Sequence, residues 1–288
     1  MKAARFSLMR PRDLAEALSI LADSGEAAKI MAGGQSLGPM LNLRLVEPEV
    51  VVDISGLLEL RRFERTERGL SIGACVTHAD IEDGRVPDVA NGMLVKVAGG
   101  IAYRAVRNRG TVGGSLSHAD PAADWVSAMS VLGAEVDVVS KGGARRVTLG
   151  ELLRGALDVA LSPAELVRSI HIEAPPASAR WGYAKHCRKV GEFAHAIGAV
   201  LIDPKAGRGR LVIGAVEAPP IVIEDARALF GGSIGPAFAS NFDPDAADAA
   251  LQAAGLSDAV DRHVHIAVLW RAILQAAGHP AAPLRHAA

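Results

Sequence analysis

Two stretches decide how this sequence is interpreted: AGGQSLGPMLNLRLVEPEVVVDIS at residues 32–55 and RNRGTVGGSLSHADPAADW at residues 107–125. Each contains a glycine pair, Gly33-Gly34 in the first and Gly113-Gly114 in the second. Paired glycines lack Cβ atoms and accept positive φ angles, so successive backbone N–H groups can converge on an anion. The pattern favours a cradle for a pyrophosphate or an extended sugar chain. One glycine pair alone is also typical of an ordinary turn, whereas two pairs in one half of the chain favour a binding loop.

Small hydroxyl side chains accompany both glycine pairs. Ser36 follows the first pair, and Thr111 and Ser115 flank the second. These hydroxyl groups could add donors to the backbone N–H groups. The sequence has no G-x-G-x-x-G that opens a strand–helix unit and no G-x-x-x-x-G-K-[ST], which disfavours a Rossmann NAD site and a P-loop.

Charged residues flank the second glycine pair. Arg104, Arg107 and Arg109 precede it, and they could face phosphate, a partner protein or solvent. Asp120 is placed to cap a helix expected over Pro121 to Leu132. Asp124, one turn further on, could accept hydrogen bonds from ribose or ribityl hydroxyls.

A metal site is the weaker interpretation of the same region. His118, Asp120 and Asp124 have a spacing that resembles a metal-ligand pattern. Glycine loops do not need a metal, and no third kind of ligand is evident, so we expect no metal here.

The composition excludes several classes of protein. The chain has 288 residues and a formal net charge of −1, which argues against a nucleic-acid binder. No apolar run approaches the ~20 residues needed to span a bilayer, and no signal-peptide pattern is present, so we expect a cytoplasmic protein. The two cysteines exclude a disulfide framework and an iron–sulfur cluster held by this chain alone.

Hydrophobic periodicity divides the chain into an α/β portion and a smaller α+β portion, joined near Pro175-Pro176. In the first portion, strands are expected over Ala27 to Met31, Val50 to Ile54, Leu70 to Ala74 and Ala134 to Val139, the last in a hairpin with Arg145 to Leu149, and helices over Pro11 to Asp23, Pro87 to Val97 and Pro121 to Leu132. In the second, strands are expected over Trp181 to His186, Phe193 to Ile202 and Arg210 to Val216, followed by helices over Ile223 to Phe230, Pro244 to Ala254 and Asp258 to Ala277.

With both glycine stretches in view, the sequence resembles the FAD-binding medium subunit of the molybdenum hydroxylases, the family of xanthine dehydrogenase and carbon monoxide dehydrogenase. The motifs AGG-[HQ]-S and T-[IV]-GG-S occur in the family's order and at its distance, and ADPAAD at 119–124 matches as well. The resemblance extends over nearly the whole chain. Each motif alone is weak, but the combination is specific.

The resemblance implies an α+β protein. A two-lobed α/β FAD-binding domain of the vanillyl-alcohol-oxidase type would span residues 1–176, with lobes of about 1–57 and 58–176. A C-terminal domain over 177–288 would contain a three-stranded antiparallel sheet and a helix bundle. The cofactor would be non-covalent FAD. The partners would be a large subunit with molybdopterin and a small subunit with two [2Fe–2S] clusters, assembled as a dimer of heterotrimers.

The resemblance also implies a set of FAD-binding residues. Met31, Ala32, Gly33, Gly34, Gln35, Ser36 and Leu37, together with Thr111, Val112, Gly113, Gly114 and Ser115, would surround the pyrophosphate and the ribityl chain. Asp124 would bind FAD hydroxyls, Ile101 would lie near the adenine, and Leu166 or Val167 would touch the flavin. Lys185 would contact the flavin and favour its reduced, anionic form, and Phe193 would stack on the isoalloxazine ring.

The implied function is electron transfer. The FAD would accept electrons from the [2Fe–2S] clusters of the partner subunit and pass them to an external acceptor, while the molybdenum centre oxidises the substrate. This role needs no general acid or base from the chain, so no catalytic residue is expected. Two alternatives stay open: a self-contained flavin oxidase that acts on a small organic substrate, and a scaffold whose flavin site has decayed.

Overall fold

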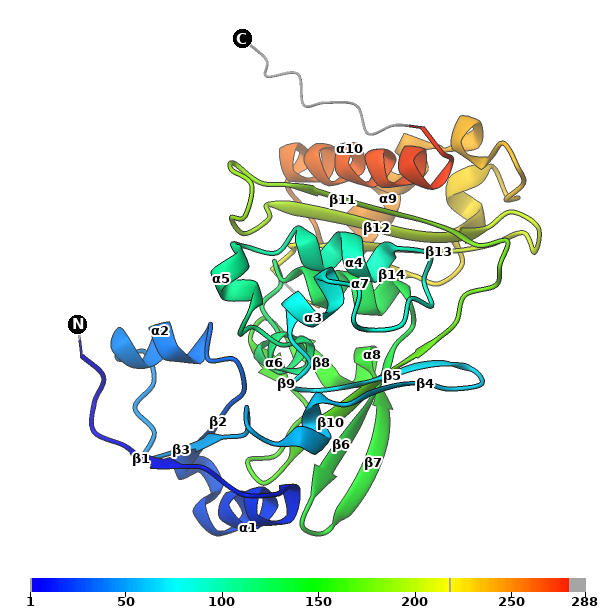
Figure 1. Cartoon of the computed structure of the whole chain (residues 1–288). Coiled ribbons are helices and arrows are strands. Elements are labelled where there is room, and N and C mark those ends of the chain that lie inside the picture. Colours follow the sequence, from blue (N-terminus) through cyan, green and yellow to red (C-terminus); the bar gives the residue numbers. More distant parts are fainter. Residues whose placement is uncertain (1, 218, 280–288) are drawn as a thin grey trace. The chain divides into compact units, whose positions relative to one another are not determined.

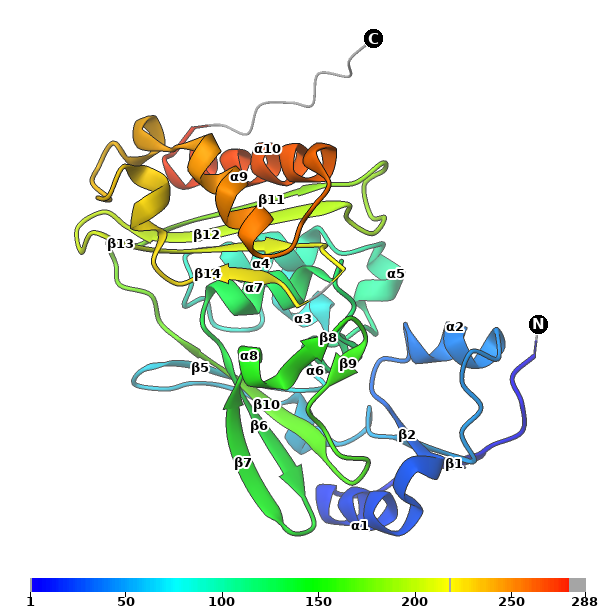
Figure 2. The ribbon, with the colours of Figure 1, turned by 180° about the vertical axis from the view of Figure 1, so that it is seen from behind.

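The computed structural model of the chain describes residues 2–217 and 219–279, which form two compact units (Figures 1 and 2). Of the described residues, the first unit comprises 2–120 and 133–174. The second comprises 121–132, 175–217 and 219–279. The short segment 121–132 therefore packs with the C-terminal part of the chain, although it lies within the N-terminal part of the sequence.

The first unit begins with a three-stranded parallel sheet of order β1-β3-β2. Helix α1 (Leu14–Ser24) buries Ala17 and Leu21 in the core of this lobe, and the Asp13 side chain caps its first turn. The helix and strands expected here from periodicity are confirmed, because their apolar positions follow the helical and strand repeats. The strands and the short helix that follows β2 are β1 (Ser7–Met9), β2 (Ala28–Met31), β3 (Val50–Asp53) and α2 (Leu37–Asn42).

A five-stranded antiparallel sheet of order β4-β5-β10-β6-β7 follows in the same unit. Leu70, Ile72, Ile170 and Ile172 are buried, which gives the sheet one apolar face. The expected β6–β7 hairpin is confirmed, whereas the central strand β10 has no counterpart among the expected strands. The strands are β4 (Phe63–Arg65), β5 (Gly69–Gly73), β6 (Glu135–Ser140), β7 (Gly143–Thr148) and β10 (Leu166–Glu173).

Short helices connect these two sheets. The helix expected over Pro87 to Val97 begins only at Met93, because the Asp88 carboxylate accepts hydrogen bonds from the N–H groups of Ala90 and Gly92 and so forms a turn. Gly92 has a φ of 85°, which interrupts the helix at that residue. The connecting elements are α3 (His78–Glu82), α4 (Met93–Gly99), α5 (Arg104–Arg107), α6 (Val112–His118), α8 (Leu149–Leu152), β8 (Leu153–Gly155) and β9 (Asp158–Val159).

The second unit contains a four-stranded antiparallel sheet of order β11-β12-β13-β14. Two expectations are corrected here. The sheet has four strands instead of three, and the helix expected over Ile223 to Phe230 is a strand, Ile221–Ile223, followed by the 3-10 helix Ala226–Phe230. Ile221 and Ile223 pair with β13, so backbone pairing decides their conformation. The strands are β11 (Arg180–His186), β12 (Ala196–Asp203), β13 (Arg208–Gly214) and β14 (Ile221–Ile223).

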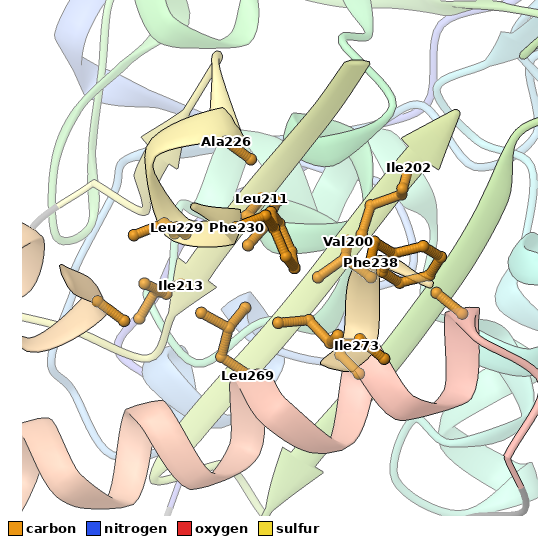
Figure 3. Close-up of a cluster of buried hydrophobic side chains, with 14 of the residues drawn as sticks. Val200, Ile202, Leu211, Ile213, Ala226, Leu229, Phe230, Phe238, Leu269 and Ile273 are labelled. Carbon is orange, nitrogen blue, oxygen red and sulfur yellow. The ribbon is translucent and has the colours of Figure 1, made fainter. Parts of the chain in front are cut away.

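The helices of the second unit pack on this sheet instead of forming a bundle. Helix α10 (Ala259–Ala276) covers one face, and α9 (Pro244–Ala253) packs beside it (Figures 1 and 2). Gly182 and Gly198 allow the close approach, since a Cβ atom on either would collide with the α10 backbone. Phe230 and Phe238 lie in the core between the layers (Figure 3), and their ring centroids are 6.1 Å apart.

Helix α7 (Asp124–Val131) contacts the opposite face of this sheet through β12 and β13. A Cβ atom on Gly214 of β13 would collide with the Ser127 hydroxyl group of α7. The helix begins at Asp124, later than the expected Pro121, and its N-cap residue Ala123 provides no side-chain hydrogen bond. The N-cap residue is thus Ala123 and not Asp120, which corrects the expectation from sequence.

Candidate functional site

The first glycine loop follows β2 and contains a row of adjacent backbone N–H groups. Gly34 has a φ of 70°, a conformation that favours glycine. The Gln35 side-chain amide donates to the Gly33 carbonyl over 3.2 Å. Within the described residues, the five N–H groups from Gly33 to Leu37 donate to no protein acceptor. Five neighbouring amides without protein partners form a donor set that suits an anion.

The second glycine loop packs against the segment that joins β5 to α3. The N–H of His78 donates to the Gly110 carbonyl over 2.9 Å, and the N–H of Gly113 donates to the Ala74 carbonyl over 3.1 Å. Thr111 caps α6 by accepting a hydrogen bond from the N–H of Gly114. A Cβ atom on Gly113 would collide with Ala74, so the close approach of these two segments requires glycine.

The fold brings the two glycine loops together within the first unit. The Arg109 side chain donates to the Gly33 carbonyl over 3.2 Å, and a Cβ atom on Gly33 would collide with the Arg109 backbone carbonyl. The Cα atom of Gly114 also faces Ala32, since a Cβ atom built there would lie 3.7 Å from the Ala32 Cβ. Stretches 76 residues apart in the sequence are therefore neighbours. Gly33 is required for this contact between loops.

The arginines before the second loop link helix α5 to the end of helix α3. Arg107 donates to both carboxylate oxygens of Glu82, at 2.7 and 2.9 Å, and to the carbonyls of Ile101 and Ala102. Arg104 pairs with Glu82 and Asp83. These interactions join α5 to α3, and hydrogen bonding from Arg107 lowers the pKa of Glu82. Arg104 and Arg107 therefore have a structural role, which was not among the three roles that the sequence left open.

His78, which was not predicted from the sequence, packs against the second glycine loop. Its imidazole is buried against Gly110, at 2.7 Å from where a Gly110 Cβ would be. Burial, with a smaller contribution from the Arg107 charge, lowers the pKa of His78 to about 4. The ring is therefore neutral at physiological pH. No motif marks this residue, because its burial depends on residues distant in the sequence.

The second unit brings together Asp124 of α7 with Tyr183 and Lys185 of β11. The Tyr183 hydroxyl donates to Asp124 Oδ1 over 2.7 Å, and the Lys185 ammonium donates to Oδ1 and Oδ2 over 2.9 and 3.0 Å. Burial, followed by the Asp124 charge, raises the pKa of Tyr183 well above its ordinary value. Asp124 and Lys185 were selected from the sequence, whereas Tyr183 was not, although its spacing of two from Lys185 puts both on one face of a strand.

The other selected residues occupy varied environments. Leu166 and Val167 are both buried in β10, Ile101 is partly buried, and the Phe193 ring is 71% exposed. No group of three or more potential metal-ligating side chains occurs in the described part of the chain. His118 and Asp120 therefore belong to no such group.

These observations test whether the first unit fits FAD. A dinucleotide needs donors for two phosphate groups and an approach unobstructed by side chains. The loop from Gly33 to Leu37 provides the donors, and the glycines of both loops provide close backbone packing. The Ser36 and Ser115 hydroxyl groups lie in partly or fully exposed positions on the same loops. The residues present therefore fit the pyrophosphate of such a cofactor.

Comparison with known proteins decides the family. Residues 4–175 match the family described as the FAD binding domain in molybdopterin dehydrogenase. The chain belongs to this family. Its resemblance to the FAD-binding medium subunits of the molybdenum hydroxylases, oxidoreductases with FAD as the cofactor of this subunit, is confirmed.

Several relatives match most of the chain. The nicotine 6-hydroxylase medium subunit of Paenarthrobacter nicotinovorans is 31% identical over 94% of this chain and 93% of its own. The caffeine dehydrogenase subunit beta of Pseudomonas sp. (strain CBB1) is 34% identical over 77% and 76%. Quinoline 2-oxidoreductase from Pseudomonas putida 86 contains a chain that is 33% identical, with a TM-score of 0.83 and coverage of 96% and 99%. A chain of the CO dehydrogenase from Oligotropha carboxidovorans has a TM-score of 0.86 at 27% identity, with coverage of 97% and 100%.

These relatives show that the medium subunits of multi-subunit molybdenum hydroxylases share the mixed α/β fold of this chain. In the described residues, no helix is both long enough and apolar enough to cross a membrane.

Proposed function

We propose that this chain carries FAD non-covalently as an electron-transfer subunit. It accepts electrons from [2Fe–2S] clusters of a partner subunit and passes them to an external acceptor. The observation that carries the proposal is the row of five N–H groups from Gly33 to Leu37, which have no acceptor among the described residues and lie beside a second glycine loop. Bound FAD supplies the redox chemistry, and the chain supplies position and electrostatics.

Each proposed contact has a physical role. The amides and hydroxyl groups of residues 31–37 and 111–115 bind the pyrophosphate and sugar chain, with the Arg109 side chain holding the Gly33 carbonyl in place. The Asp124 carboxylate accepts from cofactor hydroxyl groups. The Lys185 ammonium stabilises negative charge on the reduced flavin. Ile101, Leu166 or Val167, and Phe193 complete the proposed set through apolar contacts.

The assembly and organisation are part of the proposal. The partners are a large molybdopterin-binding subunit and a small iron–sulfur subunit in a cytoplasmic dimer of heterotrimers. Residues 1–176 form the FAD-binding domain, with two lobes of the vanillyl-alcohol-oxidase type, and 177–288 form the C-terminal domain. The names of the relatives, which include medium and beta subunits, support a multi-subunit assembly.

The test begins with the purified full chain. Absorption bands of flavin, with FAD released by heat and identified by mass, are expected at one FAD per chain. Co-expression with the proposed molybdenum and iron–sulfur subunits should then give a complex whose flavin is reduced by the substrate of the large subunit. A chain that stays colourless with added FAD, alone and in the complex, would contradict the proposal. Turnover of a small alcohol or amine by the isolated flavoprotein would support the alternative of a self-contained oxidase.

A further inference from the structure

The carboxylate of Asp124 is shared unequally between its protein partners. Oδ1 accepts from both Tyr183 and Lys185, whereas Oδ2 accepts from Lys185 alone. A carboxylate has about four acceptor positions, two on each oxygen. Within the described residues, Oδ1 is therefore saturated and Oδ2 keeps one position for a further donor. The hydroxyl group of Tyr183 is the interaction that distinguishes the two oxygens.

Nothing in helix α7 itself fixes the carboxylate. Asp124 is the first residue of the helix, and the helix has no side-chain cap that would tie its first turn. The Lys185 ammonium ends a flexible side chain and bridges both oxygens, so it does not select one of them. The Tyr183 ring is rigid and buried, and its hydroxyl group approaches Oδ1 only.

The strand register explains why Tyr183 can act on both charged groups. Tyr183 and Lys185 are two residues apart in β11 and so point to the same face of the sheet. Gly182, which precedes Tyr183, and Ala184, which lies between Tyr183 and Lys185, point to the other face, where Gly182 meets α10. The raised pKa of Tyr183 keeps its proton in place, so the hydroxyl group stays a donor throughout the physiological pH range.

We propose that Tyr183 is a positioning residue for the cofactor: its hydroxyl group occupies Asp124 Oδ1, which turns Oδ2 toward a ligand hydroxyl group and fixes the Lys185 ammonium. This inference rests on the proposed function, in which Asp124 and Lys185 contact FAD. It adds a residue that touches no ligand and acts through the other two.

The test compares Tyr183→Phe with the wild-type full chain. The variant keeps the ring and loses the hydroxyl group. We expect the dissociation constant of FAD to rise about 5- to 10-fold, an effect of the size of one ordinary hydrogen bond, because Tyr183 acts on the cofactor only through Asp124 and Lys185. Without the tyrosine donor, Asp124 attracts Lys185 more strongly, so reduced flavin should lose about threefold more affinity than oxidised flavin. For a two-electron couple, this lowers the midpoint potential by about 14 mV.

The chain provides a matched control in Tyr103, its other tyrosine, which is 67% exposed and lies in the first unit. Tyr103→Phe should leave the potential unchanged. A double-mutant cycle with Asp124→Ala gives the decisive readout. If Tyr183 acts through Asp124, then Tyr183→Phe has no further effect on FAD affinity or potential in the Asp124→Ala background.

The outcomes separate this inference from the proposed function. Wild-type protein that binds no FAD contradicts the proposed function. Wild-type protein that binds FAD, with Tyr183→Phe equal to it in affinity and potential, overturns the positioning role. Equal effects of Tyr183→Phe in the two backgrounds overturn it as well. If Tyr183→Phe does not fold, Asp124→Asn carries the test: it keeps an oxygen that accepts from the Tyr183 hydroxyl group, loses the charge that holds the Lys185 ammonium, and should weaken FAD binding. Unchanged affinity would overturn the inference.

Discussion

At the residue scale, Gly33 shows why one position of the loop requires glycine, whose side chain is a single hydrogen atom. Its missing Cβ leaves room for the Arg109 carbonyl, so the glycine is needed for the contact between the two loops. The adjacent Gly34 is needed for another reason, its φ of 70°. The sequence motif presents the pair as one feature, whereas the structure gives each glycine a separate physical requirement.

Replacing Gly33 should therefore separate the loops. Gly33→Ala is expected to weaken FAD binding at least 10-fold and to lower the free energy of unfolding by about 1–3 kcal/mol, as for overpacking. Gly38→Ala is the matched control, because a Cβ atom there meets nothing within 4 Å. Fluorescence titration with FAD and urea unfolding measure the two effects. Equal affinities for the two variants would show that the contact between loops is dispensable.

His78 predicts a pH dependence of stability. Its pKa falls from 6.5 in the unfolded chain to about 4 in the folded protein, so the unfolded state binds more protons between these values. Stability is thus fully present above pH 6.5 and is lost as the pH falls toward 4. Between pH 8 and pH 5 this group should remove about 2 kcal/mol from the free energy of unfolding. Urea unfolding of the wild type and of His78→Gln at both pH values measures it. If His78→Gln loses as much unfolding free energy between pH 8 and pH 5 as the wild type, other groups cause the effect.

At the scale of elements, the connection between α3 and α5 depends on Arg107. This side chain bridges Glu82 and two carbonyls, and it is only 12% exposed, whereas Arg104 on the same helix is 47% exposed. A buried bridge cannot be replaced by water, while a surface ion pair contributes little.

Arg107→Met should therefore destabilise the protein by about 2–3 kcal/mol, in the range of lost hydrogen bonds to charged groups. It should also weaken FAD binding, because the second glycine loop follows α5 directly. Arg104→Met, the control on the same helix, should change stability by less than about 1 kcal/mol. Both are measured by urea unfolding and FAD titration. Comparable losses in the two variants would contradict the assignment.

At the scale of the whole molecule, FAD should act as a stabilising ligand. A ligand that binds only the folded state adds RT ln(1 + [L]/Kd), which is about 2.7 kcal/mol at one hundred times the dissociation constant. Thermal unfolding with and without FAD measures this as a rise in melting temperature that grows with concentration. Riboflavin lacks the pyrophosphate and should give a much smaller rise. An equal rise would place the main interactions outside the glycine loops.

The sequence by itself determined the local features of this protein. The strand directly before Gly33, the β6–β7 hairpin and helices α1, α9 and α10 follow from apolar periodicity, because a repeat of two or of about 3.6 residues is visible within one element. The two glycine motifs indicated the family and the cofactor, because the backbone of such a loop depends on its own residues.

Only the tertiary structure decided the features that depend on long-range contacts. Strand β14 forms because Ile221 and Ile223 find partners in β13, although the local pattern favours a helix. Segment 121–132 belongs to the second unit because α7 packs on the four-stranded sheet. The burial of His78 and the hydrogen bond from Tyr183 to Asp124 join residues far apart in the chain. No local pattern records such pairs, since burial and partner choice are set by the folded chain as a whole.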